Sequence, residues 1–193
     1  MKNIEQELKM ALSEREYNIL LDVAKVEPQL QTNYYFRCKA MPDDLMVRLR
    51  KKGEEYILCY KRRLSLHNGV AVCDERECEV SATFADSLCS RGITQAELKT
   101  LLGVDFLKEL QADLPKSLQM VGSMDTYRAK FKIEDWTLEL DKNEYLGKVD
   151  YELECENLYV EQLEKLKNYL FYAYGIIFRQ SLPKVERFLR ARK

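Results

Sequence analysis

Charged residues recur at a spacing of two along several segments of this chain of 193 residues. The first segment is Glu5-x-Glu7-x-Lys9, and each later segment carries charges of a single sign. Residues two apart lie on the same face of a β-strand. The chain is therefore predicted to contain strands that each present a charged face. The later segments are Arg48–Arg50, Lys61–Arg63, Glu75–Glu77–Glu79, Arg128–Lys130–Lys132, Glu139–Asp141 and Glu152–Glu154.

Like charges on one strand face repel each other. At a separation of about 6.6 Å and an effective dielectric constant of about 20, the repulsion is about 2.5 kcal/mol. A solvated face of an antiparallel sheet also alternates polar with apolar residues, but it usually mixes the signs of its charges. Repeated rows of one sign indicate that the counter-charge comes from elsewhere, either from a neighbouring strand or from a bound ion.

The opposite faces of these segments are apolar. Val47 and Leu49 flank Arg48, and Leu138 and Leu140 flank Glu139. Amphipathic helices can cover such apolar faces. The charged faces then either meet water on an open sheet or converge inside a wide barrel, and the periodicity alone is compatible with both.

Local signals predict an α+β protein whose strands are mostly antiparallel. Ser13–Glu16 and Thr94–Glu97 have the pattern of capping boxes, which begin helices. No linker or repeat interrupts the chain, so residues 1–193 are predicted to form a single domain. The predicted strands are 3–11, 30–38, 46–51, 55–63, about 73–80, about 118–133, 136–141 and 148–156; the predicted helices lie between Ser13 and Pro28, over 84–114, over 159–174 and after Ser181.

The composition excludes several classes of protein. The net charge is −1, which gives no overall basic field for nucleic acid. No apolar run could span a membrane and the N-terminus lacks the apolar stretch of a signal peptide, so a cytoplasmic location is predicted. The six cysteines form no C-x-x-C pair, which argues against zinc or a disulfide framework. The only histidine, His67, precedes Asn68-Gly69 and is predicted to lie in a loop.

Acidic and basic rows together suit phosphoryl transfer. Carboxylates bind Mg²⁺ or Mn²⁺, whereas arginine and lysine bind phosphate oxygens. Phosphoryl-transfer enzymes combine both, because the metal bridges phosphates and the cations neutralise charge in the transition state. No P-loop pattern of glycines is present to hold a nucleotide in that way.

Glu5-x-Glu7-x-Lys9 resembles the signature of the CYTH superfamily, the triphosphate tunnel metalloenzymes. Further segments resemble the bacterial YjbK-like branch of that superfamily in the same order along nearly the whole chain. Arg37-Cys38 departs from the pattern, because much of the branch has an acidic residue there. The matching segments are 31–36, Arg48-x-Arg50, Lys61, 138–156 and Ser181-x-x-Lys184-x-x-Arg187-Phe188.

This resemblance implies a closed antiparallel β-barrel, with helices packed on its outer face and a charged interior that binds triphosphate. It implies that Glu5, Glu7 and Lys9 are catalytic. The metal ligands for Mg²⁺ or Mn²⁺ would be Glu5, Glu7, Glu77, Glu139, Glu152 and Glu154. The substrate-binding residues would be Lys9, Arg48, Arg50, Lys61, Arg128, Lys130 and Lys184. Residues with the same strand parity but a less secure assignment are Arg63, Lys132, Asp141 and Lys148.

Several alternatives remain open at this point. Arg48 and Arg50 could form cross-strand salt bridges with acidic rows, and Lys184, Arg187 and Arg190 could form a solvated helix face. The leading hypothesis is a metal-dependent hydrolase of inorganic triphosphate, because nothing obvious recognises a nucleobase. The alternatives are an adenylyl cyclase, a thiamine triphosphatase, a non-enzymatic module that binds polyphosphate or nucleotide, and an open-sheet interaction domain. A triphosphate-containing small molecule is the expected partner, and no oligomeric state is predicted.

Overall fold

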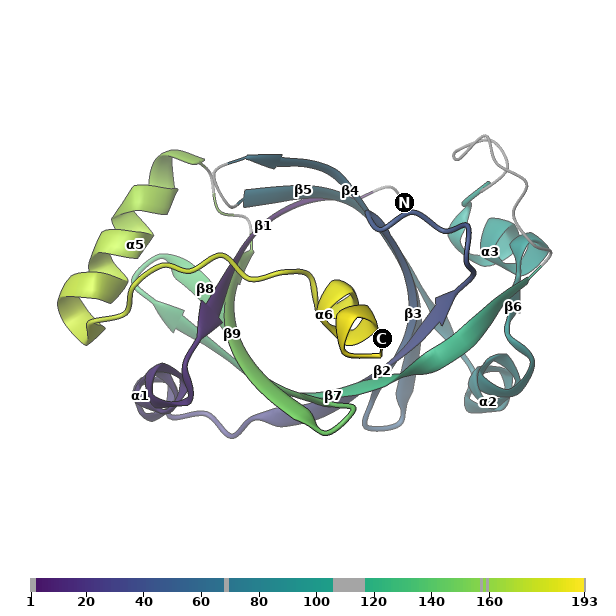
Figure 1. Cartoon of the computed structure of the whole chain (residues 1–193), viewed down its shortest axis with the longest axis horizontal. Coiled ribbons are helices and arrows are strands. Elements are labelled where there is room, and N and C mark those ends of the chain that lie inside the picture. Colours follow the sequence, from purple (N-terminus) through teal and green to yellow (C-terminus); the bar gives the residue numbers. More distant parts are fainter. Residues whose placement is uncertain (1–2, 68–69, 106–116, 157, 159, 193) are drawn as a thin grey trace.

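Eight antiparallel strands close into a barrel (Figure 1). The computed structural model describes residues 3–67, 70–105, 117–156, 158 and 160–192, without the side chains of 3–5 and 160–161. Around the barrel the order is β2-β3-β4-β5-β1-β9-β8-β7, and a β2–β7 pairing closes it. The strands are β1 (Asn3–Leu12), β2 (Gln29–Arg37), β3 (Leu45–Lys52), β4 (Glu55–His67), β5 (Val70–Val80), β7 (Ser117–Ile133), β8 (Trp136–Tyr145) and β9 (Lys148–Glu156).

The strand register brings the charged rows onto one surface. Lys9 of β1 lies opposite Glu154 of β9, and Glu154 lies opposite Glu139 of β8. Glu139 lies in turn opposite Lys130 of β7. Directly paired residues point to the same face of a sheet. Since the sheet is closed, the charged faces converge inside the barrel, which excludes the open-sheet alternative.

Helices cover the apolar outer face of the barrel, as predicted; those in the described part of the chain are α1 (Glu14–Ala24), α2 (Ala82–Arg91), α3 (Gln95–Leu102) and α5 (Val160–Tyr174). Leu20 of α1 and Leu166 of α5 pack in one core with the outward side chains of β1, β7, β8 and β9. Leu88 of α2 and Leu98 of α3 pack in a second core with those of β2, β3 and β4. The capping boxes at Ser13 and Thr94 are both present and begin α1 and α3.

The terminal helix α6 (Lys184–Ala191) occupies one end of the barrel interior (Figure 1). Its Val185 and Phe188 pack with the buried, inward-facing Tyr35 and Met124. Gly122 of β7, at φ +141°, makes room for this helix, because a Cβ atom there would lie 2.5 Å from Phe188 Cζ. The helix therefore closes part of the barrel and carries its own side chains into it.

The structure corrects two predicted segments. The predicted helix over 84–114 is interrupted at Gly92 (φ +83°), after which β6 (Ile93–Thr94) pairs with β7 and α3 begins. Residues 106–116 of that prediction lie outside the described residues. His67, predicted to lie in a loop, instead ends β4 and pairs with Val70, because the β4–β5 ladder continues up to that pair. None of the helices in the described part of the chain is long and apolar enough to cross a membrane.

Candidate functional site

The interior of the barrel holds a cavity of about 570 Å³. A second cavity of about 320 Å³ shares Arg50, Arg128, Lys130 and Glu139 with it, so the two form one charged tunnel. Glu152 is fully buried behind the wall, and the side chain of Glu5 lies outside the described residues. The predicted site residues that line the larger cavity are Glu7, Lys9, Arg48, Arg50, Lys61, Glu77, Arg128, Lys130, Glu139, Glu154 and Lys184.

A trio of buried carboxylates lies on the β8–β9 wall. Asp141, Glu152 and Glu154 each offer an oxygen atom, and these atoms lie within 4.8 Å of one another. Lys184 Nζ lies 2.7 Å from Asp141 Oδ2 and 2.8 Å from Glu154 Oε1, and it also pairs with Glu152. The register of β8 and β9 accounts for the trio, since Asp141 lies opposite Glu152.

Arg128 of β7 reaches the same trio from the neighbouring strand. Its Nε and Nη2 donate to both oxygens of Asp141, at 2.7 and 2.6 Å. Its Nη2 also donates to Glu154 Oε2 at 2.8 Å, and its Nη1 pairs with Glu139. Bidentate pairs of this kind fix the guanidinium in one orientation. Arg128 is therefore held by ion pairs with β8 and β9 while it lines the cavity.

These cations keep the buried acids ionised. Burial would raise the pKa of Glu154, but Lys184, Lys9 and Arg128 outweigh it and hold the pKa well below its usual value. Burial likewise opposes ionisation of Asp141, and Lys184 and Arg128 lower its pKa. Burial would lower the pKa of Lys184, yet Asp141 and the two glutamates raise it. The wall therefore carries full charges of both signs at neutral pH.

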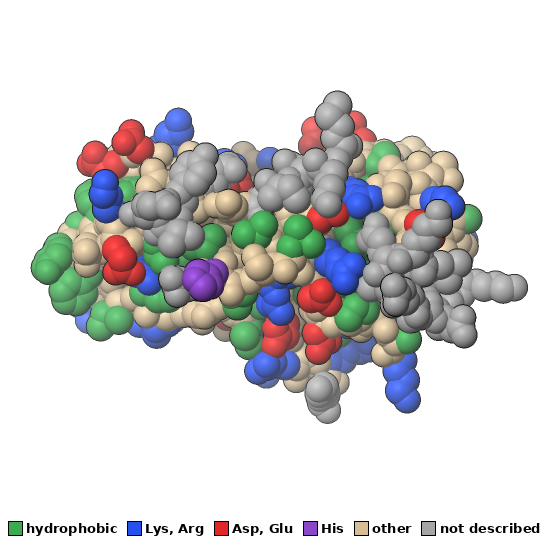
Figure 2. Space-filling model, turned by 90° about the horizontal axis from the view of Figure 1, so that it is seen from above, with side chains coloured by type: hydrophobic (Ala, Val, Ile, Leu, Met, Phe, Trp, Pro, Cys, Tyr) green, Lys and Arg blue, Asp and Glu red, His purple; other side chains and the backbone are tan. Residues whose placement is uncertain are grey.

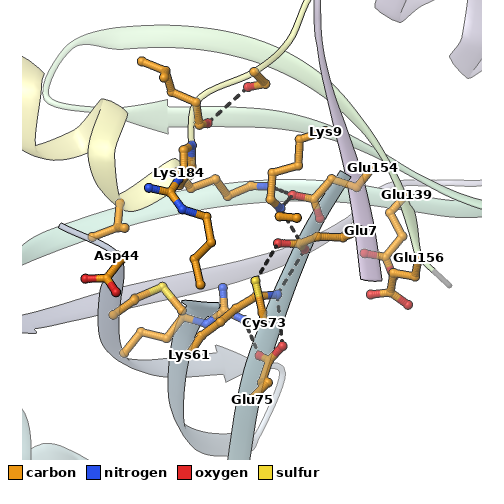
Figure 3. A pocket seen from close by; sticks show the side chains of 18 of the residues that line it. Glu7, Lys9, Asp44, Lys61, Cys73, Glu75, Glu139, Glu154, Glu156 and Lys184 are labelled. Carbon is orange, nitrogen blue, oxygen red and sulfur yellow. Dashed lines mark hydrogen bonds and ion pairs between the residues drawn. The ribbon is translucent and has the colours of Figure 1, made fainter. Parts of the chain in front are cut away.

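Glu7 and Lys9 of β1 lie between the β8–β9 wall and the wall formed by β3, β4 and β5 (Figure 3). Lys9 Nζ lies 3.1 Å from Glu7 Oε2 and also pairs with Glu154. Lys61 Nζ of β4 lies 3.0 Å from Glu7 Oε2 and 3.1 Å from Glu75 Oε2. Burial would raise the pKa of Glu7, but Lys9 and Lys61 lower it below its usual value. The first-strand residues thus stand between the acidic trio and the basic residues of β3 and β4.

The wall formed by β3, β4 and β5 leaves hydrogen-bond donors unused. Arg48 Nη2 lies 3.4 Å from Glu75 Oε1, and Arg50 Nη1 lies 3.8 Å from Glu77 Oε1. The Nε atoms of both arginines are buried and have no hydrogen-bond partner among the described residues. Buried donors of this kind are normally satisfied, so their orphan state suits an anion that supplies oxygen atoms.

Replacement of Glu77 by glutamine is expected to stabilise the metal-free protein slightly at about pH 8. Partial burial and the carboxylate of Glu75 raise the pKa of Glu77. An acid with a raised pKa binds protons more tightly in the folded state, so its contribution to the free energy of unfolding falls as pH rises through that range. The Glu77→Gln advantage should therefore shrink as pH falls and vanish below the ordinary glutamate pKa of about 4.3, where Glu77 becomes protonated in both states.

Urea denaturation in EDTA at several pH values measures this difference. Glu79→Gln is the matched control, because Glu79 follows Glu77 by two residues on the same strand and, unlike Glu77, is not among the described residues that line the cavity. A lower midpoint for Glu77→Gln than for wild type at the higher pH would show instead that the ion pair with Arg50 dominates.

The acidic trio fits a hard divalent cation. All three side chains offer carboxylate oxygens, which Mg²⁺ and Mn²⁺ prefer. A second group, Cys59, Glu75 and Glu77, also brings its ligand atoms within 4.8 Å, but one of these is a thiol sulfur. The Cys59 thiol donates to Glu75 Oε1 at 3.0 Å, and burial raises its pKa well above the usual value, which disfavours the thiolate that binds metal.

The structure separates the predicted metal ligands. Glu152 and Glu154 lie together, Glu7 and Glu139 are each joined to Glu154 through one cation, and Glu77 belongs to the β5 wall. Asp141 completes the trio, although the resemblance did not place it in the ligand set. The sequence feature that could have assigned Asp141 to the site is its spacing of two from Glu139, which places both residues on the same face of β8.

The terminal helix shows which of its cations belong to the site. The side chains of Lys184 and Arg187 are only 8% and 13% exposed, whereas that of Arg190 is 63% exposed. The alternative that these residues form a solvated helix face is therefore wrong for Lys184 and Arg187, and it is confirmed for Arg190. On the outer face shown in Figure 2, acidic and basic side chains are interspersed.

Comparisons with known proteins agree with the fold and the tunnel. The sequence profile of the CYTH domain matches residues 3–189. The chain is 27% identical over 198 residues to YjbK of Bacillus subtilis (strain 168), whose assignment as a triphosphatase is provisional; the match covers 100% of this chain and 97% of that protein. The predicted resemblance to the YjbK-like branch is thus confirmed.

Two solved structures show the same fold. A protein of Bacillus halodurans, provisionally assigned as an adenylate cyclase, has a TM-score of 0.77 at 24% identity, with 97% of this chain and 98% of that chain covered. HpAC1 of Hippeastrum, an adenylyl cyclase candidate described as having a dominant triphosphatase activity, also has a TM-score of 0.77 at 24% identity, with 98% and 96% covered. These likenesses confirm the predicted closed barrel.

Proposed function

Because the chain belongs to the CYTH domain family, we propose that it is a metal-dependent triphosphatase that acts on inorganic triphosphate. The observation that carries this proposal is the charged cavity in the barrel, which is lined both by Glu154, one of the three clustered carboxylates, and by Arg48 and Arg50, whose Nε donors are unused. The full-length similarity to YjbK supports the same reaction.

The acidic residues are proposed to hold the metal. Asp141, Glu152 and Glu154 form its centre, with Glu7 and Glu139 nearby in the strand register. The proposed set also includes Glu5, two residues before Glu7 on β1, and Glu77 on the wall formed by β3, β4 and β5. Mg²⁺ or Mn²⁺, when bound, would bridge phosphate oxygens and neutralise their charge. The cations that now pair with these carboxylates keep them ionised and ready to act as ligands.

The basic residues are proposed to fix the phosphates and to stabilise charge on the oxygens that surround the transferred phosphorus. Arg48 and Arg50 present unused Nε donors, and Lys130 lines both cavities. Cations already oriented by neighbouring strands need little reorganisation during the reaction. The complete proposed set is Lys9, Arg48, Arg50, Lys61, Arg128, Lys130 and Lys184.

Two acids are suited to accept the proton of the attacking water. Burial and the charge of Glu139 raise the pKa of Glu156, and burial and Glu75 raise that of Glu77. Both residues line the larger cavity. A pKa moved toward neutrality favours general-base catalysis. We assign the proton acceptor to Glu156, because Glu77 already belongs to the proposed metal-holding set.

Inorganic triphosphate is preferred over a nucleotide because of what lines the tunnel. None of the described residues that line the two cavities is aromatic, so they offer no stacking surface for a base. Their charged side chains recognise phosphates alone. An adenylyl cyclase remains the second candidate, because relatives of this fold are assigned to both reactions.

A panel of substrates tests the proposal. Inorganic triphosphate, ATP and thiamine triphosphate are incubated with Mg²⁺ or Mn²⁺, and all products are identified. Orthophosphate and pyrophosphate from inorganic triphosphate, at the highest kcat/KM of the panel, are expected. Cyclic AMP as the main product from ATP would assign the cyclase reaction, and binding without turnover of any member would assign a binding module.

A further inference from the structure

Lys184 differs from the other proposed phosphate-binding residues in how it is held. Lys9, Arg48, Arg50, Lys61, Arg128 and Lys130 all project from barrel strands, whose pairing fixes their positions. Lys184 is the first residue of α6, and Pro183 before it makes no side-chain cap. A helix start without a cap leaves backbone donors unsatisfied and frays easily. The position of Lys184 in the tunnel therefore depends on whatever anchors α6.

Arg187, one turn further along α6, supplies that anchor. Its Nε lies 2.9 Å from Asp150 Oδ2 and its Nη2 lies 3.2 Å from Asp150 Oδ1. Its Nη1 donates to Glu152 Oε2 at 2.6 Å and also to Ser181 Oγ and the Leu182 carbonyl. One guanidinium thus ties the helix, the segment before it and strand β9 together.

Asp150 is itself held in place by β8. Tyr145 Oη donates to Asp150 Oδ2 at 2.6 Å, and Asn143 Nδ2 donates to Asp150 Oδ1 at 3.0 Å. Thr126 Oγ1 of β7 donates to Asn143 Oδ1 at 2.8 Å. The anchor of α6 is therefore connected to three adjacent barrel strands, which makes it rigid.

Among the described residues that line the cavity, Lys184 is present and Arg187 is not. We propose that Arg187 is a positioning residue: through Asp150 and Glu152 it sets where Lys184 stands in the tunnel, and so it controls the affinity for triphosphate without touching it. The inference rests on the proposed function, because it takes triphosphate as the ligand.

Binding of diimidotriphosphate, a non-hydrolysable analogue of triphosphate, tests the proposal by calorimetry in the presence of Mg²⁺. Arg187→Gln and Lys184→Met are each expected to raise Kd roughly tenfold, the loss typical of one charge-assisted contact. The double variant is expected to bind no more weakly than Lys184→Met alone, because Arg187 acts through Lys184. Arg187→Lys should not restore affinity, since lysine keeps the charge but cannot form the fork.

Arg190→Gln is the matched control, because Arg190 lies on the same helix, is exposed and pairs only with Glu186 in the described structure. Circular dichroism gives the folded fraction of each variant at the temperature of the titration, and the apparent Kd is multiplied by that fraction to give the Kd of the folded protein. If wild type does not bind the analogue, the proposed function fails. If wild type binds the analogue and Arg187→Gln binds it equally well, only the positioning role is overturned. The same holds if the affinity losses of Arg187→Gln and Lys184→Met multiply to about a hundredfold in the double variant.

Discussion

Glu154→Gln is expected to lower kcat for triphosphate hydrolysis by roughly a thousandfold or more. Glu154 lies where the acidic trio meets the cations, since its oxygens contact Lys9, Lys184 and Arg128. Glutamine keeps the shape of the side chain but loses the charge that a divalent cation needs. It also cannot balance three cations in a buried place, so their orientation toward the substrate is disturbed as well.

Initial rates over a range of Mg²⁺ and triphosphate concentrations measure this loss. Metal affinity, followed with Mn²⁺ by electron paramagnetic resonance, should weaken in parallel. Glu144→Gln is the control, because Glu144 lies on the neighbouring strand β8 and pairs with Lys142 at the surface. Retention of more than about a tenth of wild-type kcat by a folded Glu154→Gln protein would contradict a metal role for this carboxylate.

Much of the barrel could be predicted because its signals are local. Residues two apart in a strand always lie on the same face, so Arg48 and Arg50 share a face of β3 independently of the rest of the chain. The Ser13 and Thr94 capping boxes likewise depend on four consecutive residues. Closure was different in kind, because it depends on the β2–β7 pairing between segments about ninety residues apart along the chain.

The unpredicted parts of the site depend on such distant contacts. Asp141 shares its face with Glu139, but only the pairing with Glu152 and the approach of Lys184 make it part of a trio. From the sequence alone, Arg187 could equally be a buried residue of the site or a solvated helix residue, since nothing in the sequence of α6 places that helix inside the barrel. Its burial follows from Gly122, which lies far away in β7 and leaves space for Phe188.

Arg128→Met is expected to cost about 3–5 kcal/mol of the free energy of unfolding, the penalty for leaving buried charges without their partner. Arg128 contacts Asp141, Glu139 and Glu154, and Asp141 is fully buried. Methionine fills a similar volume along the stem but leaves the Asp141 carboxylate with Lys184 as its remaining ion pair among the described residues.

The loss in free energy of unfolding caused by Arg128→Met should become smaller as pH falls. Without Arg128, the folded carboxylates take up protons more easily, so the deficit against wild type shrinks as pH falls toward about 4. Urea denaturation of both proteins at several pH values measures it. Lys132→Met, an exposed residue of the same strand, should change stability by less than about 0.5 kcal/mol.

A second substitution separates the lost partner from the lost side-chain packing. Asp141→Asn in the Arg128→Met background removes the stranded charge and is expected to recover part of the stability, although Asp141→Asn alone destabilises the protein. Such recovery would show that Arg128 is needed because the acidic trio is there, and that the trio has to remain ionised for its proposed role with a divalent cation. A double variant as unstable as the sum of the two single variants would instead make Arg128 a packing residue, and the trio would then lose its main support as a centre of charge.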